Sequence, residues 1–165
     1  MLDDSDPIET AERFAELEEQ LVASLLAVEQ HGRESDQAKA AYAHLGFLFS
    51  PLKLVPKHFE SVAKYPRGAL RKIRAQEKII SNICNRLAKM PRDVFLSEFP
   101  GNETNVGWAD ELIASGASYA PAIRRNAVDL RRAQRKLSMV VDEAGISLAE
   151  IKDINRRMTM GEARA

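Results

Sequence analysis

The side chains that most often carry chemistry are few in this sequence and lie far apart. The three histidines are His31, His44 and His58, and none stands three residues after a Glu, the spacing found in carboxylate-bridged iron bundles. There is no HExxH sequence and no cysteine pair, so the chain offers no recognisable zinc ligand set. We therefore expect no metal and no other cofactor, and interpret the histidines as surface or helix-end residues.

Nucleophilic and nucleotide chemistry are equally hard to find. The only cysteine, Cys84, lies between Ile80 and Leu87 on an apolar stripe, which predicts a buried thiol rather than a reactive one. No glycine-rich loop follows a strand pattern, and no two carboxylates stand together in an apolar stretch. The sequence therefore predicts a protein that is not an enzyme. A single cysteine is also typical of a protein from a reducing cytoplasm.

Basic side chains gather at three places, and these clusters could bind a charged partner. Two of them fall on long helices expected over residues 69–90 and 121–144, and the third lies on the last expected helix. Such clusters can neutralise phosphates, because each contact releases condensed counterions. The alternative interpretation is that they only keep exposed helix faces solvated. The candidates are Arg71, Lys72 and Arg74 in the first cluster, Arg131, Arg132 and Arg135 in the second, and Lys152, Arg156 and Arg157 in the third.

The formal net charge of zero conceals a pattern of opposite blocks. Residues 1–36 carry 11 acidic and 2 basic side chains, whereas residues 53–92 carry 11 basic and 2 acidic ones. Residues 93–120 have 5 carboxylates and no Lys or Arg, and residues 121–165 have 10 basic against 6 acidic side chains. Such blocks favour internal complementarity, or one face for nucleic acid and another for a basic partner.

Apolar residues recur at helical spacing through most of the chain, and no stretch alternates with the period of a strand. Asp6-Pro7-Ile8-Glu9 predicts the start of a first helix and Gly32 its end. A second helix should begin at Ser35 or Asp36 and end at Ser50-Pro51. The next helix is expected over 56–65, with a break or kink at Pro66-Arg67-Gly68. The later helices are expected over 69–90, around 94–99, around 108–113, over 121–144, and onward from the capping box at Ser147–Glu150.

These elements predict an all-α fold, a helical bundle around two long antiparallel helices with shorter crossing helices. A chain of 165 residues is long enough to bury a real core. Its apolar runs are much shorter than a bilayer span, so no association with a membrane is expected. The predicted core residues are Phe14, Leu21, Ile80, Ile83, Leu87, Leu130 and Leu137.

The final stretch, "EIKDINRRMTMGEARA" at 150–165, has a helix start signal and no Gly or Pro that would end it, which suggests a piece of a longer protein. It closely resembles the segment that leads into the second conserved region of the primary bacterial sigma factor, the housekeeping branch of the sigma-70 family. The acidic start "DDSDPIE" looks like the end of that family's acidic linker. Other segments follow in the family's order and spacing: "FAEL" at 14–17, "KLVPKHFE" at 53–60, "RAQEKIISNIC" at 74–84, "KMPRDVFLSEFPGNET" at 89–104 and "ISLAEIKDINRRM" at 146–158.

The resemblance implies the non-essential region, a helical insertion between the first and second conserved regions. Residues 1–6 would then be the end of the acidic linker, 7–146 the helical insert, and 147–165 a helix leading into the promoter-binding second region. In the family this insert stands beside the clamp formed by the largest polymerase subunit and near upstream duplex DNA. One departure is Pro66-Arg67-Gly68, where the family usually continues a Met- and Arg-rich helix.

The implied function is that of a non-catalytic module of a sigma factor, which directs RNA polymerase to promoters and tunes promoter binding and escape. The implied partners are the polymerase core, promoter DNA through the full-length protein, and accessory transcription regulators, all in the cytoplasm. Two alternatives remain: a free-standing helical adaptor that binds RNA polymerase, and an enzyme with a dispersed site.

The nine basic candidates become, on this resemblance, the residues expected to face polymerase or DNA. On the last helix, Ile151, Ile154 and Met158 are expected to point inward. Lys152 and Arg156 share an outer face and are expected to meet the partner, while the (i, i+4) pair of Asp153 and Arg157 orients the helix.

Overall fold

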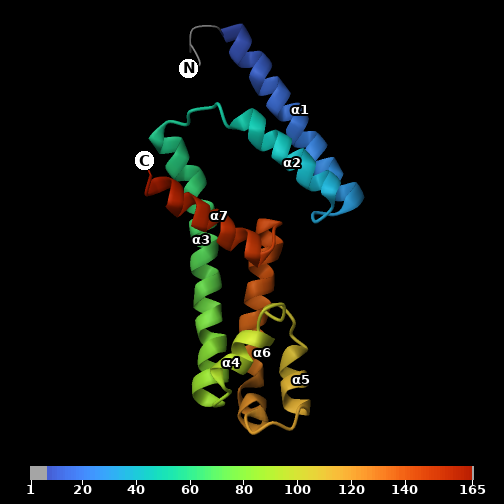
Figure 1. Ribbon diagram of the computed structural model, residues 1–165, viewed down its shortest axis with the longest axis vertical. Helices are drawn as coiled ribbons and strands as arrows, with labels where there is room; N and C mark the ends of the chain where they lie inside the picture. Colours follow the sequence, from blue (N-terminus) through green and yellow to red (C-terminus); the bar gives the residue numbers. More distant parts are fainter. Residues whose placement is uncertain (1–6, 165) are drawn as a thin grey trace. The chain divides into compact units, whose positions relative to one another are not determined.

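The computed structural model describes residues 7–164, and the regular structure of these residues is helical throughout (Figure 1). This confirms the all-α prediction. The chain divides into two compact units, the N-terminal unit (Met1–Phe59) and the C-terminal unit (Glu60–Ala165). The expected linker at 1–6, with the Asp6 cap, lies outside the described residues. None of the described helices has the length and apolar character that crossing a bilayer requires.

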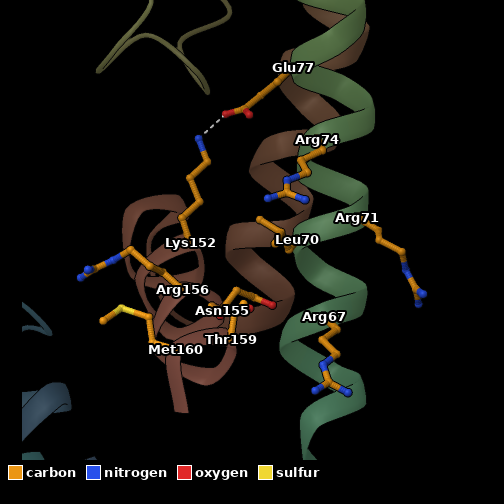
Figure 2. Close-up of a pocket in the computed structure, with 10 residues that line it drawn as sticks. All are labelled: Arg67, Leu70, Arg71, Arg74, Glu77, Lys152, Asn155, Arg156, Thr159 and Met160. Atoms are coloured by element: carbon orange, nitrogen blue, oxygen red, sulfur yellow. Dashed lines mark hydrogen bonds and ion pairs between the residues drawn. The ribbon is translucent and has the colours of Figure 1, made fainter. Parts of the chain in front are cut away.

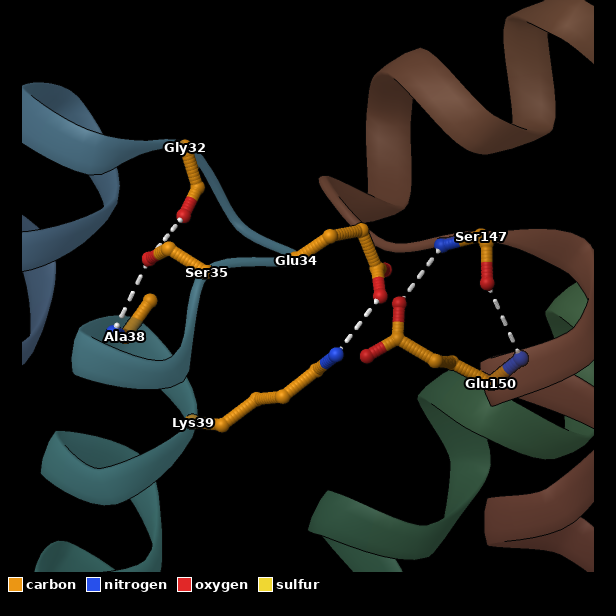
Figure 3. A network of polar contacts seen from close by, with 7 residues as sticks. All are labelled: Gly32, Glu34, Ser35, Ala38, Lys39, Ser147 and Glu150. Atoms are coloured by element: carbon orange, nitrogen blue, oxygen red, sulfur yellow. Dashed lines mark hydrogen bonds and ion pairs between the residues drawn. The ribbon is translucent and has the colours of Figure 1, made fainter.

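The N-terminal unit is a pair of helices, α1 (Pro7–His31) and α2 (Asp36–Phe49). Gly32 ends α1 with a φ of 83°, a left-handed conformation that a residue with a Cβ adopts at a cost. Ser35 caps α2, because its Oγ accepts the backbone N–H of Ala38 at 3.1 Å (Figure 3). Both boundaries were predicted. A hydrogen bond of 3.0 Å from Gln20 Nε2 to the carbonyl of Ala41 joins the two helices.

The seam between α1 and α2 buries only small residues. Ser24 and Ala38 are fully buried, whereas Phe14 is 57% exposed and Leu21 is 43% exposed. The prediction that Phe14 and Leu21 belong to the core is therefore wrong. Two helices meet along one narrow seam, so the larger apolar side chains lie beside it instead of being enclosed. They line a shallow hollow together with Leu17, Tyr42, Leu45 and Phe49.

The C-terminal unit is built on two long antiparallel helices, as predicted. These are α3 (Pro56–Ser81), most of which belongs to this unit, and α6 (Ala120–Ala144) (Figure 1). The shorter helices α4 (Arg92–Glu98), α5 (Trp108–Ala114) and α7 (Leu148–Glu162) complete it. Its core encloses large side chains, among them Ile73, Ile80, Ile83, Trp108, Ile123, Leu130, Leu137 and Ile151.

Of the break or kink predicted at Pro66-Arg67-Gly68, the break does not occur, because α3 passes through Pro66 as one helix. The residues on either side, Ala63 and Ile73, are both buried, and Ile73 belongs to the hydrophobic core. Tyr65 also anchors this turn, because its hydroxyl donates to the carbonyl of Glu143 on α6 at 2.9 Å. These tertiary contacts outweigh the hydrogen bond that a proline nitrogen cannot make.

The predicted continuation of this helix to Met90 is also wrong. After Ser81 the chain widens into a π-helical turn, Asn82–Leu87, in which the N–H of Ala88 donates to the carbonyl of Ile83 at 2.9 Å. The wider turn buries Ile83 and Cys84 but rotates Leu87 outward to 52% exposure, so Leu87 is not a core residue. Burial raises the pKa of the Cys84 thiol to about 12, as expected for an unreactive cysteine.

The start of α7 is fixed by local chemistry that the sequence does predict. Gly145 ends α6 in the left-handed region with a φ of 67°. Ser147 then caps α7, with its Oγ accepting the N–H of Glu150 at 3.2 Å (Figure 3). The Glu150 carboxylate accepts the N–H of Ser147 at 3.0 Å, which completes the capping box. These bonds determine where α7 begins and therefore which of its residues face α3.

Candidate interaction groove

A groove runs between α3 and α7 within the C-terminal unit (Figure 2). Its volume is about 760 Å³, and residues from both helices form its walls. Five of the lining residues are cationic and one is acidic, so the groove has a positive lining. The cations are Arg67, Arg71, Arg74, Lys152 and Arg156, the acid is Glu77, and Leu70, Asn155, Thr159 and Met160 complete the lining.

Asn155 holds the two walls of the groove together. It is buried, and its Nδ2 donates to the carbonyl of Pro66 on α3 at 2.9 Å and to that of Ile151 at 2.8 Å. One turn later, the hydroxyl of Thr159 donates to the carbonyl of Asn155 at 3.1 Å. The bond to Pro66 sets the register of α7 on α3, because a buried amide that lost its partner would be costly.

Three of the five cationic side chains of the groove form ion pairs. Lys152 Nζ meets Glu77 at 2.5 Å across the groove, as the dashed line in Figure 2 marks. Arg67 pairs with Glu162 on α7 and, at 3.4 Å, with Glu60. Arg156 pairs with Asp153 at 2.5 Å. Because these pairs are partly or largely exposed, each contributes at most about 1 kcal/mol, and a competing anion can replace the carboxylate.

Asp153 lies on the outer side of α7 between two arginines. A hydrogen bond from Arg156, and the charges of Arg156 and Arg157, hold the pKa of the Asp153 carboxyl below its usual value. The distance from Arg157 Nε to the Asp153 carboxylate is 3.0 Å, so the expected (i, i+4) pair forms. Asp153 also binds Arg156 at 2.5 Å, which was not anticipated.

The two remaining cations of the groove are uncommitted. Arg71 and Arg74 form no ion pair with any other residue between 7 and 164. Figure 2 shows the Arg74 guanidinium extending toward α7, whereas the Arg71 side chain extends from the other side of α3, away from α7. Arg74 therefore gives the groove positive charge that no carboxylate neutralises, and Arg71 adds such charge at its outer edge.

The structure brings some of the predicted basic residues together and leaves others apart. The groove unites Arg71 and Arg74 from the first cluster with Lys152 and Arg156 from the third. Lys72 instead meets Glu143 on α6 at 3.0 Å, and Arg157 is not among the residues that line the groove. In the second cluster, Arg131 pairs with Asp110 and Arg132 with Asp129 at 2.7 Å, while Arg135 is exposed on α6.

Sequence reasoning missed Asn155 and Thr159 in this groove. The expected inward stripe of α7 was Ile151, Ile154 and Met158, but Ile154 and Met158 are only half-buried and Asn155 is buried instead. Asn155 follows Ile151 by four residues, so a polar residue continues the apolar face. That position was the signal that could have identified it.

No group of three or more His, Cys, Asp or Glu side chains within residues 7–164 is arranged as a metal site. The groove contains no nucleophile next to a base, since its only hydroxyl, that of Thr159, donates to the backbone. What the groove can do chemically is to attract and orient an anionic group by its guanidinium and ammonium donors.

Comparison with known proteins identifies the class to which this helical chain belongs. The family model for the sigma-70 non-essential region matches residues 3–140, and the chain is a member of that family. A curated relative, RNA polymerase sigma factor RpoD of Neisseria gonorrhoeae, is 27% identical over 149 residues. That alignment covers 90% of this chain but only 23% of the relative, so the chain spans about a quarter of the relative's length.

Proposed function

We propose that this chain is the non-essential region of a primary sigma factor and acts as a non-catalytic module in transcription initiation. Membership of the sigma-70 non-essential-region family and similarity to a protein named RNA polymerase sigma factor support the assignment. In this proposal the full-length factor directs RNA polymerase to promoters in the cytoplasm. The region described here adds contacts that tune promoter binding and escape.

The observation that carries the proposal is that cationic residues from both α3 and α7 line one groove. Partners in initiation that carry negative charge, whether polymerase side chains or DNA phosphates, are attracted to such a surface. The partners proposed are the clamp of the largest polymerase subunit, promoter DNA through the full-length protein, and accessory regulators. The candidates on α6, Arg131, Arg132 and Arg135, remain a second proposed contact surface.

Helix α7 has a mechanical role in this proposal. It is joined to α3 by the Asn155–Pro66 hydrogen bond and by the Lys152–Glu77 ion pair. In the full-length factor the segment 147–165 would lead into the promoter-binding region. A module held rigidly on that helix can transmit a contact made in the groove to the part that reads the promoter.

The test is to replace Lys152 and Arg156 together by Ala in a full-length factor that carries this region. Holoenzyme is reconstituted, and the lifetime of open complexes and the ratio of abortive to full-length RNA are measured at low salt. We expect the lifetime to change by about twofold to tenfold, since each exposed charge contributes up to about 1 kcal/mol. The melting temperature of the chain itself should fall only slightly.

The matched control replaces Arg124 and Arg125 by Ala. These residues are exposed on α6 and lie outside the groove lining. Their replacement by Ala removes the same amount of positive charge as the groove variant does. Their replacement should change open-complex lifetime less than the groove variant does. Initiation kinetics unaltered by the Lys152 and Arg156 changes would leave both residues as mere solubilising charges and contradict the proposal.

A further inference from the structure

The α3–α7 groove combines charge with apolar surface, and this combination points to one class of ligand. We propose that the groove binds a short acidic peptide segment that also carries apolar side chains, supplied by a partner protein. This inference rests on the proposed function and names the chemistry of the partner at the same site. It favours a protein contact over nucleic acid for this particular surface.

Free positive charge is the first requirement, and the groove supplies it. Arg71 and Arg74 line the groove and have no ion-pair partner among residues 7–164, so a carboxylate can bind them without displacing another. A guanidinium presents its donors in a planar fork that matches a carboxylate bidentately. Arg74 extends toward α7 and can bind an acidic side chain in the groove, while Arg71 extends away from α7 and adds positive charge at the outer edge.

Exchangeable pairs at the groove edges are the second element. Lys152–Glu77 and Arg156–Asp153 are partly exposed ion pairs, and each contributes little to the free energy of folding. An incoming acidic segment can take over Arg156 or Lys152 at small cost, while the uncommitted arginines provide the net gain. A neighbouring carboxylate, Glu77, remains in the lining and would repel a dense row of charges.

Apolar surface is the third element, and it favours a peptide over DNA as the ligand. Leu70 is half-buried and Met160 is 43% exposed, and both line the groove among the aliphatic stems of the basic residues. A flexible methionine adapts to different apolar side chains. The phosphates of a nucleic acid offer no apolar group to such a surface. A leucine or valine side chain between acidic residues of a peptide does offer one.

Shape supports the same assignment. Double-stranded DNA offers a convex, evenly charged surface that suits an exposed basic face rather than a hollow between two crossing helices. A hollow of about 760 Å³ accommodates a few side chains of a peptide. The phosphate-facing role therefore fits the open face of α6 better, where Arg132 and Arg135 are exposed.

The experiment titrates the full chain with two fluorescent probes, a short peptide repeating Asp-Glu-Leu and a double-stranded DNA of unrelated sequence. Nuclear magnetic resonance follows the ε-methyl groups of Met160 in the groove and of Met139, which is exposed on α6. We expect the peptide to shift the Met160 signal and to leave the Met139 signal in place. Replacing Arg71 and Arg74 together by Gln should weaken peptide binding about tenfold or more.

Two controls make the result specific. A peptide repeating Asp-Glu-Ser tests the apolar contribution and should bind more weakly than the leucine peptide. The variant Arg124→Gln with Arg125→Gln loses the same charge outside the groove and should change peptide affinity less than about twofold. Circular dichroism checks that both variants keep the helical content of the parent chain.

Three outcomes would overturn the inference. They are no Met160 shift with the peptide, equal losses of affinity in the two arginine variants, or a Met160 shift caused by DNA in preference to the peptide. The last would assign the groove to nucleic acid. If the peptide binds as expected but the Lys152 and Arg156 changes leave initiation unaltered, the groove is a peptide site and the proposed function fails alone. If initiation changes without peptide binding, only the ligand class is wrong.

Discussion

The two units of this chain are both assembled from helices with apolar stripes, but they bury different kinds of residue. Within the C-terminal unit, Trp108, Ile80 and Leu130 are almost completely enclosed. In the described part of the N-terminal unit, the buried residues are the small Ser24 and Ala38. The spacing of apolar residues therefore shows which face of a helix tends to be buried. The number of neighbouring helices determines whether that face is buried in the folded chain.

Helix number explains the difference physically. In the C-terminal unit, α4, α5 and α7 pack around α3 and α6. The apolar faces of α3 and α6 therefore contact side chains from several helices. The α1–α2 pair has a single seam, which Gln20 closes by a hydrogen bond to Ala41. Stability should then be concentrated in the C-terminal unit, and substitutions of similar size should have different effects in the two units.

The largest expected effect is in the C-terminal core. Ile83 is 4% exposed in the π-helical turn, so Ile83→Ala removes three buried carbon atoms and leaves a cavity. We expect a loss of about 2–5 kcal/mol in the free energy of unfolding. Urea denaturation monitored by circular dichroism measures it. A loss below about 0.5 kcal/mol would show that the turn repacks freely and would remove Ile83 from the core.

An intermediate effect is expected at the contact between α7 and α3. Asn155→Ala removes the hydrogen bonds to the carbonyls of Pro66 and Ile151, and should cost about 1–3 kcal/mol. It should also increase hydrogen exchange of α7 amides more than those of α6, because α7 loses its anchor.

The matched control for Asn155 is Asn126→Ala. Asn126 donates only to Ala122 on its own helix, at 2.8 Å, and is half-buried. Its replacement should leave the exchange of α7 amides unchanged. If the two alanine variants loosened α7 to the same extent, the Asn155–Pro66 bond would not be what holds α7 in register.

Much of the helical framework was predictable because its signals are local. Gly32, Ser35, Gly145 and the Ser147–Glu150 box each determine a boundary by conformation or hydrogen bonding within a few residues. The failures depend on contacts between distant segments. Pro66 stays inside α3 because Tyr65 and Ala63 are held by tertiary contacts, which no window of sequence around a proline reveals.

The candidate groove was predictable only in its parts. Charge clustering identified Arg71, Arg74, Lys152 and Arg156, but nothing in the sequence shows that residues about eighty positions apart share one groove. Asn155 was missed because helical periodicity was applied to apolar residues alone. Gln134 is a comparable case on α6, a buried amide that donates to the carbonyls of Asn102 and Asn105 at 2.9 and 2.8 Å.

The smallest expected effect is in the N-terminal unit, where Phe14→Ala can be compared with Phe95→Ala in the C-terminal unit. Phe95 is buried and stacks on Phe99 with ring centroids 5.0 Å apart, so its replacement should cost about 3–5 kcal/mol. Phe14 is 57% exposed beside the α1–α2 seam, so much of its ring already meets water and its loss should cost less than about 1 kcal/mol. Urea denaturation of both variants under identical conditions measures the two losses in the free energy of unfolding. Equal losses would mean that Phe14 is enclosed in solution, and the contrast between a covered and an uncovered helical face would then disappear.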